Sequence, residues 1–434
     1  MKTKSYKDTI NIVTLGCSKN LVDTEVLMRQ IEANNLKVVH DSNSFNAKTV
    51  IINTCGFIKD AKEESINTIL NFANAREAGK IDHVYVMGCL SERYKKDLEK
   101  EIPEVDKYFG VNDLNDIIKT IGGNYKHELI GERLTTTPQH YAYLKVSEGC
   151  DRTCSFCAIP LIRGKHHSKS IDDIILEAEN LVNKGVKELL LIAQDLTFYG
   201  VDIYKRQALN DLLNRLADIK NLEWIRLHYA YPASFPTEIL KTIRERDNIC
   251  KYLDMPVQHV SSDVLKKMRR GHTKGQIEDL ISLIKSEVPE IALRTTMLVG
   301  HPGEDDKAFN ELMEFIAREK FDRLGVFTYS EEEDTFSARN YKDEIPEEVK
   351  EMRKEKIMDL QAGISLEINQ NKIGKVFKTI VDRKEGDYYI GRTEFDSPEV
   401  DNEVIIRSEQ FKTGNFYNVK ITAAEEFDLI GKKV

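Results

Sequence analysis

Six of the seven cysteines in this 434-residue chain fall into two groups of three. Cys150, Cys154 and Cys157 are crowded into one loop, SEGCDRTCSFCAIP, directly after the strand-like run YLKVS. Cys17, Cys55 and Cys89 are far apart in the sequence, but each follows a short β-branched run that is typical of a buried strand. The fold must therefore gather one set of thiols from distant segments and present the other set from a single loop.

The N-terminal part alternates strand-like and helix-like segments. The runs Ile12–Leu15, Val50–Ile52 and Val84–Met87 resemble buried strands, and the segments that begin at Thr24 and Ala61 have apolar residues at helical spacing. This alternation predicts an open, doubly wound parallel sheet over residues 1–125.

The cysteines of this part stand where the predicted strands end. Because the carboxyl ends of parallel strands face one crevice, Cys17, Cys55 and Cys89 are expected to converge there. The alternative is that they are small buried residues that only fill space.

A second βα series covers residues 136–370. Six strand-like segments are spaced by helices, which predicts a partial or complete parallel barrel of the (βα)6 type, ending in a charged helical connector from Pro346 to Lys372. Residues 371–434 instead show alternating runs broken by Gly, Asp and Asn, which predicts a small antiparallel β-barrel of OB-like size. The chain is thus expected to be an α/β protein of three domains.

The short spacing of Cys150, Cys154 and Cys157 favours an iron–sulfur cluster. Three thiolates can hold three irons of a 4Fe-4S cluster and leave the fourth iron free for a small molecule. A structural zinc site is the alternative, with His166 and His167 nearby as further ligands. Cys250 belongs to neither group and is expected to be a core thiol.

Composition excludes several classes of protein. No apolar run approaches the length of a membrane span, and the first residues contain no apolar stretch followed by a cleavage site, so we expect a soluble, cytoplasmic protein with no membrane partner. A formal charge of -9 argues against tight binding of nucleic acid by the chain as a whole. In a reducing compartment the cysteines remain available as thiols or metal ligands.

These motifs together resemble a known family. SEGCDRTCSFCAIP is similar to the radical S-adenosylmethionine signature, and LGCSKN, NTCG and MGC resemble the three cysteine motifs of the methylthiotransferases. The resemblance covers essentially the whole chain and implies an N-terminal cluster domain, a radical barrel and a C-terminal TRAM barrel. It implies two 4Fe-4S clusters, one that binds S-adenosylmethionine and cleaves it to a 5′-deoxyadenosyl radical, and one on Cys17, Cys55 and Cys89 that carries or donates sulfur.

Further residues are candidate contacts to the cofactor. The resemblance implies that Phe156 packs near the adenine, with core packing as the alternative, and that Gly300, Gly303 and Glu304 form a glycine-rich cofactor contact, with a plain βα turn as the alternative. Gln194 and Asp195 end a predicted strand, so a polar contact at the barrel mouth is favoured over a helix cap.

Two subfamilies differ in their target. One modifies an adenosine next to the anticodon of transfer RNA, and the other modifies an aspartate of small-subunit ribosomal protein twelve. LGCSKNLVDTE and DMPVQHVSSDVLKKMRRG resemble the second, RimO type, which implies insertion of a methylthio group at the β-carbon of that aspartate. Acidic residues slightly outnumber basic ones from Lys375 to Val434, which suits a basic protein target better than RNA.

The expected partners follow from this resemblance. They are the ribosomal protein, free or on the ribosome, and an electron donor such as flavodoxin, with RNA contact secondary and the chain a monomer. Arg163, His166 and His167 are candidates for contacting the target, with loop solvation as the alternative. A transfer-RNA methylthiotransferase and a non-catalytic iron–sulfur scaffold that binds RNA remain the alternative functions.

Overall fold

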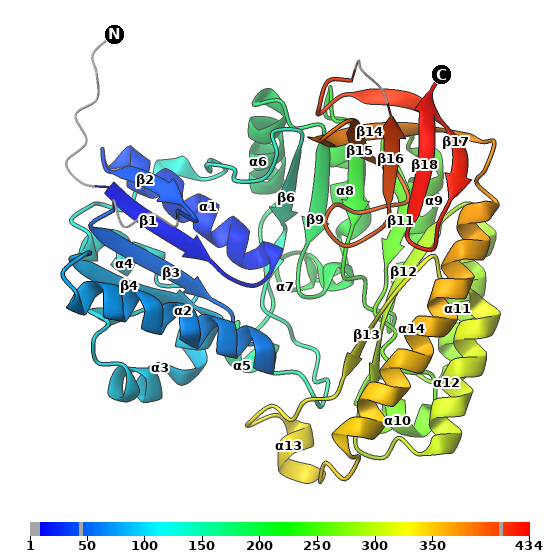
Figure 1. Ribbon diagram of the computed structural model, residues 1–434, viewed down its shortest axis with the longest axis horizontal. Coiled ribbons are helices and arrows are strands. Elements are labelled where there is room, and N and C mark those ends of the chain that lie inside the picture. Colours follow the sequence, from blue (N-terminus) through cyan, green and yellow to red (C-terminus); the bar gives the residue numbers. More distant parts are fainter. Residues whose placement is uncertain (1–8, 43–46, 408–410) are drawn as a thin grey trace.

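The computed structural model describes residues 9–42, 47–407 and 411–434, and its chain forms three successive sheet-based units (Figure 1). Residues 1–8, part of the stretch examined for a secretory signal, lie outside the described residues. Among the helices that the structure does describe, none is long and apolar enough to cross a membrane.

The N-terminal sheet has five parallel strands in the order β2-β1-β3-β4-β5, and helices cover both of its faces. Its strands are β1 (Thr9–Thr14), β2 (Lys37–His40), β3 (Thr49–Thr54), β4 (His83–Gly88) and β5 (Lys107–Tyr108). Side chains of α2 (Lys59–Glu77) and α3 (Cys89–Glu101) pack on one face, and those of α1 (Ser18–Ala33) and α4 (Leu114–Thr120) pack on the other. The predicted doubly wound sheet is confirmed, although β2 and β5 were not predicted.

The central sheet has six strands in the order β6-β9-β10-β11-β12-β13, every neighbouring pair parallel, and it forms an open partial barrel. The strands are β6 (Tyr141–Lys145), β9 (Glu188–Ile192), β10 (Trp224–Leu227), β11 (Ile249–Asp254), β12 (Ala292–Val299) and β13 (Arg323–Thr328). Each coincides with one of the six strand-like runs. The helices between them are α6 (Ile171–Asn183), α8 (Leu209–Ala217), α9 (Glu238–Glu245), α11 (Lys274–Glu287) and α12 (Asp306–Glu319).

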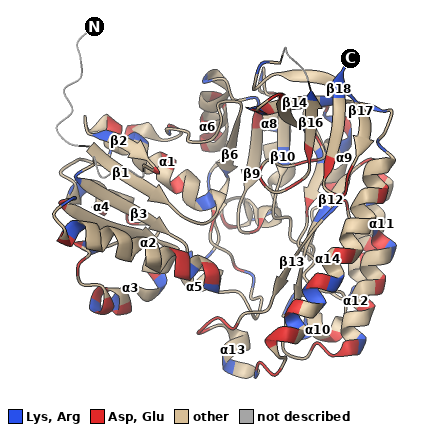
Figure 2. Cartoon of the chain, in the orientation of Figure 1, with Lys and Arg blue, Asp and Glu red and all other residues tan. Residues whose placement is uncertain are grey.

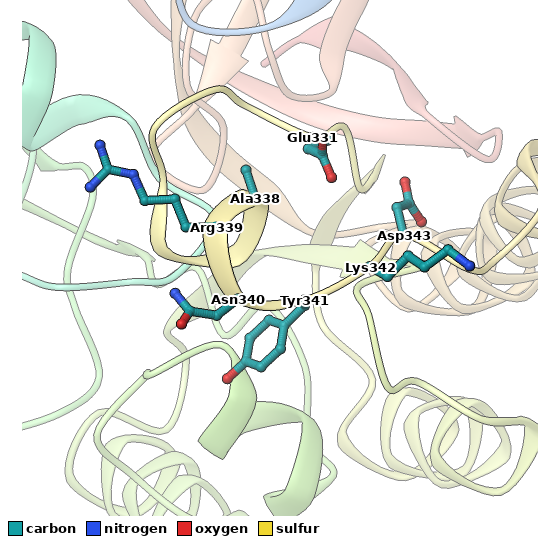
Figure 3. A pocket seen from close by; sticks show the side chains of 7 residues that line it. All are labelled: Glu331, Ala338, Arg339, Asn340, Tyr341, Lys342 and Asp343. Atoms are coloured by element: carbon teal, nitrogen blue, oxygen red, sulfur yellow. The ribbon is translucent and has the colours of Figure 1, made fainter.

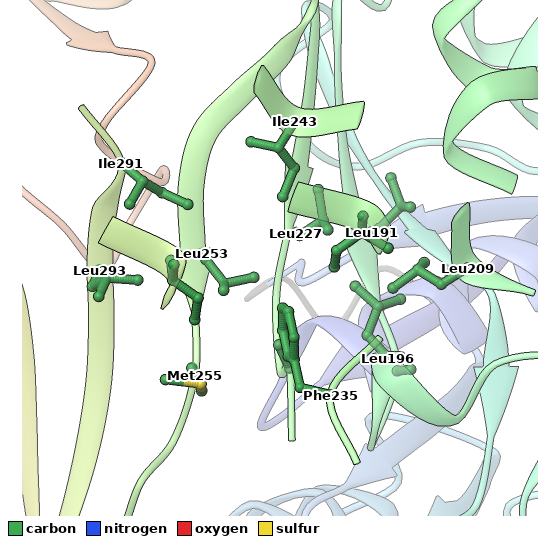
Figure 4. Close-up of a cluster of buried hydrophobic side chains, with 14 of the residues drawn as sticks. Leu191, Leu196, Leu209, Leu227, Phe235, Ile243, Leu253, Met255, Ile291 and Leu293 are labelled. Carbon is green, nitrogen blue, oxygen red and sulfur yellow. The ribbon is translucent and has the colours of Figure 1, made fainter. Parts of the chain in front are cut away.

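The core of this unit lies between the sheet and those helices. Leu191, Leu227 and Leu253 project from neighbouring strands and meet Leu209 and Ile243 of the covering helices (Figure 4). Shorter elements lie in the connections: η1 (His127–Leu129), β7 (Ser147–Glu148), α5 (Ile159–Ile162), β8 (His167–Ser168), η2 (Leu196–Phe198), α7 (Val201–Tyr204), α10 (Ser262–Lys267) and α13 (Phe336–Asn340). The apolar packing leaves the opposite face of the sheet for polar side chains, because side chains alternate along a strand.

The C-terminal unit is a closed five-stranded barrel in the order β14-β15-β16-β18-β17, joined to the central unit by α14 (Glu347–Gln370). Its strands are β14 (Val376–Glu385), β15 (Tyr388–Thr393), β16 (Glu403–Arg407), β17 (Phe416–Ala424) and β18 (Asp428–Lys433). The predicted small antiparallel barrel is confirmed, with one exception: β16 and β18 run parallel. The last strand, β18, closes the barrel by lying between β16 and β17 and was not predicted.

Buried ion pairs join this barrel to the central sheet. Arg226 of β10 donates to Glu188 at 2.8 Å, and Arg392 of β15 donates to the other oxygen of Glu188 at 2.7 Å. The three side chains are at most 2% exposed. A carboxylate in such a place needs its cations, because an unpaired buried charge is very unfavourable.

Three carboxylates of the barrel that were expected to attract a basic partner instead form ion pairs within the protein. Asp396 pairs with Arg323, Asp401 accepts from Arg294 at 3.1 Å, and Asp382 accepts from Arg392 at 2.7 Å. The interpretation that the acidic excess attracts a basic partner is therefore wrong for these three residues, since internal cations neutralise them. Elsewhere the outer helices α11, α12 and α14 have charges of both signs (Figure 2).

We predict that Arg392→Gln lowers the free energy of unfolding by about 3 kcal/mol or more, because it leaves Glu188 and Asp382 short of a cation in a buried site. Urea denaturation of the full chain measures this change. The matched control is Arg383→Gln in the same barrel, whose guanidinium is 45% exposed and pairs with Glu403; it should cost at most about 1 kcal/mol. Equal effects of the two substitutions would contradict the prediction.

Candidate active site

Cys17, Cys55 and Cys89 lie together at the carboxyl edge of the N-terminal sheet. Cys17 is the N-cap of α1, Cys55 follows β3 directly, and Cys89 is the first residue of α3. Gly16 makes the close approach feasible: its φ is +89°, and a Cβ there would lie 2.7 Å from the Cβ of Cys55. This edge lies where the strand order reverses between β1 and β3, which is the usual ligand position in such sheets.

Cys150, Cys154 and Cys157 lie in the loop between β7 and α5. All three line a cavity of about 300 Å³, together with Leu161 of α5 and Phe336 of α13. Arg270 donates to the sulfur of Cys154 at 3.4 Å, and the backbone N–H of Arg152 donates to the sulfur of Cys150 at the same distance. Cys150, Cys154 and Cys157 thus face a space that is large enough for a small molecule.

Burial opposes ionisation of these thiols. It raises the pKa of Cys55, raises those of Cys89 and Cys150 to about 11, and raises that of Cys157 to about 12. At neutral pH these four thiols are therefore protonated when no metal is bound, and a bound metal is what would hold them as thiolates.

The arrangement of the six cysteines bears on which metal group they could hold. All six are free thiols in two separate sets of three. In the described part of the chain no three His, Cys, Asp or Glu side chains are placed to hold one metal ion. A cluster differs because it distributes its ligands over several irons. The zinc alternative therefore has no matching ligand set among those residues.

Arg163 connects the two sites. Its Nε and one terminal nitrogen both lie 3.3 Å from the sulfur of Cys89, and its other terminal nitrogen donates to Asp23 at 2.7 Å and to Glu148 at 3.1 Å. The side chain is 3% exposed. The hypothesis that Arg163 contacts the target is wrong, because the guanidinium is enclosed between the two domains.

The neighbouring histidines differ from each other. The ring of His166 is buried and lies 2.9 Å from the Ser168 hydroxyl, so its proposed contact with a target is also wrong. His167 is 81% exposed and remains a candidate.

Gln194 and Asp195 have different surroundings. Gln194 donates to Glu148 at 2.6 Å, and its side-chain oxygen is buried without a partner, which leaves an acceptor for a ligand. Asp195 caps η2 by accepting from the N–H of Thr197 at 2.9 Å and pairs with Arg152 at 2.7 Å. For Asp195 the structure contains the helix cap that was the alternative, and a contact of this carboxylate with the cofactor stays a prediction.

Of the other candidate cofactor residues, Phe156 belongs to the cysteine loop, and Gly300, Gly303 and Glu304 belong to the turn after β12. The Phe156 ring packs against Met268 and Leu298 and meets the His301 ring edge to face at 6.2 Å. Gly300 and Gly303 have φ of +77° and +93°, as the turn after β12 requires. The Glu304 carboxylate is occupied by the Gly300 N–H at 2.6 Å and by Arg353 at 3.1 Å. Their roles as cofactor contacts stay predictions.

A second, outer bridge joins the N-terminal domain to the segment after β13. Glu332 in this segment pairs with Lys62 of α2 at 3.0 Å and with Arg93 of α3 at 2.6 Å, and the carboxylate is 5% exposed. The same segment reaches the cysteine loop, where the Ser337 hydroxyl donates to that of Ser155 at 2.8 Å. The segment therefore touches both cysteine-bearing units.

Another hollow has a different lining. It measures about 680 Å³ and is surrounded by Glu331 and residues 338–343 around α13 (Figure 3). No cysteine lines it. We therefore place the candidate chemistry at the smaller cavity.

Sequence reasoning missed four residues at the junction: Asn20, Asp23, Lys145 and Glu148. Asn20 and Asp23 lie on α1 beside Cys89, and Lys145 donates to Asp23 and, at 2.6 Å, to Glu148. Burial alone would raise the pKa of Glu148, but Lys145 and Arg163 lower it to about 2. The available signal was a charged residue within an otherwise buried run, as for Lys145 in YLKVS.

Comparison with family models assigns a known domain type to each part. Residues 9–110 match the model described as uncharacterized protein family UPF0004, residues 144–316 match the radical SAM superfamily, and residues 373–434 match the TRAM domain.

Curated relatives match over the full length. A protein of Cytophaga hutchinsonii is 56% identical over 100% of both chains, and one of Phocaeicola vulgatus is 57% identical over 98% of both. Each is described as ribosomal protein uS12 methylthiotransferase RimO.

Solved structures share the fold at low identity. The radical S-adenosylmethionine methyltransferase TsrM from Kitasatospora setae has a TM-score of 0.56 at 12% identity, and the match covers 88% of this chain and 79% of the TsrM chain. The cobalamin-dependent S-adenosylmethionine radical enzyme OxsB has a TM-score of 0.52 at 14% identity, and the match covers 82% of this chain and 56% of the OxsB chain. At these identities the likeness concerns the fold alone.

We predict that Glu332→Gln weakens the docking of the N-terminal domain by about 3 kcal/mol, because it leaves Lys62 and the buried Arg93 without their carboxylate. Limited proteolysis between α4 and β6 should become several-fold faster, and small-angle scattering should show a larger radius of gyration. Glu331→Gln, an exposed neighbour in the same segment, is the control and should change neither. Unchanged proteolysis of the Glu332 variant would refute the bridge.

Proposed function

The chain belongs to the ribosomal protein uS12 methylthiotransferase (RimO) family of radical S-adenosylmethionine enzymes, and we propose that it inserts a methylthio group at the β-carbon of an aspartate in uS12. The observation that best supports this proposal is the pair of cysteine triads, one at the edge of each parallel sheet, which are connected through Arg163. Such a chemistry needs both a radical source and a sulfur source, and side chains supply neither.

We assign one 4Fe-4S cluster to each triad. Cys150, Cys154 and Cys157 would hold the cluster that binds S-adenosylmethionine, and Cys17, Cys55 and Cys89 would hold the second. When bound, these groups supply a radical that removes hydrogen from the target carbon and the sulfur that replaces it.

The chain's own residues position the reactants and exclude water. Leu161 and Phe336 give the cavity beside Cys150, Cys154 and Cys157 apolar walls, which suit a cofactor with apolar parts. The unpaired side-chain oxygen of Gln194 is a further acceptor for an amino group. Phe156, Gly300, Gly303 and Glu304 are assigned further cofactor contacts on the strength of the family motif. The ion pairs of Arg163 keep the N-terminal site beside the barrel mouth, and such fixed placement is what a reaction between two bound groups requires.

The remaining assignments follow from the family. We infer domains over residues 1–125, 136–370 and 371–434, and the family-model matches over 9–110, 144–316 and 373–434 fall within these bounds. We further infer a cytoplasmic monomer that takes electrons from a donor such as flavodoxin, with RNA contact secondary.

The decisive experiment is mass spectrometry of uS12 and of transfer-RNA nucleosides from cells with and without this protein. Loss of the methylthio group from the uS12 aspartate in the deletion strain, with transfer RNA unchanged, is expected. The reverse pattern would replace this function by that of a transfer-RNA methylthiotransferase.

We predict that the two clusters bind independently, because the triads lie on separate sheets. Replacing Cys150, Cys154 and Cys157 with Ala should leave about four irons per chain, half of the unsubstituted content, and abolish cleavage of S-adenosylmethionine. Iron analysis after anaerobic reconstitution measures this. Loss of all iron from the variant would show that the sites depend on each other.

A further prediction concerns the division of labour. Replacing Cys17, Cys55 and Cys89 with Ala should leave cleavage of S-adenosylmethionine to 5′-deoxyadenosine measurable and stop formation of the methylthio product, since this triad has no part in making the radical. Chromatography of the nucleoside and mass spectrometry of the uS12 product separate the two readouts. Wild-type yield of methylthio product would make the N-terminal cluster purely structural.

A further inference from the structure

Arg163 is the group on which the contacts between the two cysteine sites concentrate. It is the C-cap of α5, six residues after Cys157, so only this short helix separates its backbone from the loop that presents Cys150, Cys154 and Cys157. Its guanidinium contacts Asn20, Asp23 and Cys89 of the N-terminal domain. The Arg163 side chain therefore extends from the segment next to the loop of Cys150, Cys154 and Cys157 to the sulfur of Cys89 in the N-terminal site.

The geometry at Cys89 is that of a two-pronged donor. Nε and a terminal nitrogen of Arg163 are each 3.3 Å from the sulfur, so two N–H groups of one plane point to a single acceptor. Asn20 orients this plane by accepting from the same terminal nitrogen, while its own amide donates to the Leu15 carbonyl at 2.8 Å and to the Thr54 carbonyl at 3.1 Å. The donors are thus held toward the sulfur by groups on α1 and on the strand ends.

Two carboxylates fix the other side of the guanidinium. Asp23 and Glu148 accept from it, and Lys145 pairs with both carboxylates. The four side chains balance two positive against two negative charges in a site where all are at most 19% exposed. Removing Arg163 would leave a negative excess next to Cys89.

The site of Cys150, Cys154 and Cys157 has a comparable donor, which belongs to the same domain as these cysteines. Arg270 donates to the Cys154 sulfur at 3.4 Å, and its guanidinium lies over the Tyr231 ring at 4.2 Å from the centroid. Hydrogen bonds to cluster sulfurs and nearby charge are recognised determinants of cluster reduction potential. Each triad therefore has one buried arginine on one sulfur, and only at Cys89 does the arginine come from the neighbouring domain.

We propose that Arg163 is a positioning residue for the N-terminal cluster: its N–H groups and charge stabilise the reduced form of the cluster on Cys17, Cys55 and Cys89, and its ion pairs hold that cluster against the radical domain. The proposal rests on the proposed function, since it assumes a cluster on that triad. One side chain would then set both the reduction potential and the position of the cluster on Cys17, Cys55 and Cys89.

The first test measures the reduction potential of the N-terminal cluster alone. In the chain with Cys150, Cys154 and Cys157 replaced by Ala, Arg163→Gln should shift the midpoint of a redox titration followed by electron paramagnetic resonance to more negative values. The expected change is at least tenfold in the reduction equilibrium, or 59 mV for one electron. Arg163→Lys, which keeps the charge without the planar fork, should shift it in the same direction by less.

Arg270→Gln in the same background is the matched control, because Arg270 contacts Cys154 and not the N-terminal triad. It should leave the midpoint unchanged. An unchanged midpoint in both Arg163 variants, with the cluster present by iron analysis, would overturn the proposal. Absence of iron from the background chain itself would instead contradict an independent cluster on Cys17, Cys55 and Cys89, which is the part of the proposed function on which this proposal rests.

The second test separates placement from general stability. In the otherwise unsubstituted enzyme, Arg163→Lys should lower the amount of methylthio product formed per 5′-deoxyadenosine released, because the radical forms while the sulfur site is displaced. A fall of both products by the same factor would mean that Arg163 only stabilises the fold and would overturn its positioning role.

Discussion

A charge that is buried between two domains ties those domains together, because separating it from its partner inside the protein is far more unfavourable than exposing an apolar contact. This chain uses that constraint at each junction. Arg163 is shared by Asp23 and Glu148, Glu332 by Lys62 and Arg93, and Glu188 by Arg226 and Arg392. The three units therefore keep one relative arrangement.

Apolar packing alone would hold these units together with less directional control. Trp224 and Phe416 do meet edge to face at 4.8 Å between the central sheet and the terminal barrel. A hydrophobic contact tolerates sliding, however, whereas a guanidinium with several acceptors specifies both distance and orientation. Chemistry that needs two bound groups at a defined separation benefits from this second kind of contact.

The thiols show the same balance between burial and charge. Burial raises the pKa of Cys89 to about 11, while the Arg163 guanidinium acts in the opposite direction. Without a metal the Cys89 thiol would thus be neutral, and a bound cluster would have a hydrogen-bond donor already directed at this ligand. In the terminal barrel, Asp382, Asp396 and Asp401 are paired with arginines of the chain and are therefore not free to attract a basic target.

Local patterns determined much of this protein from the sequence alone. Strand periodicity and the spacing of Cys150, Cys154 and Cys157 predicted the sheets and the radical loop, because these features depend on neighbouring residues. Tertiary structure alone decided that Arg163 is buried against Asp23, 140 positions away, and that Asp396 meets Arg323. It also decided that β18 pairs in parallel with β16. Charged residues look alike in a sequence whether they face water or a partner, and only the packing of distant segments removes the water that would otherwise solvate them.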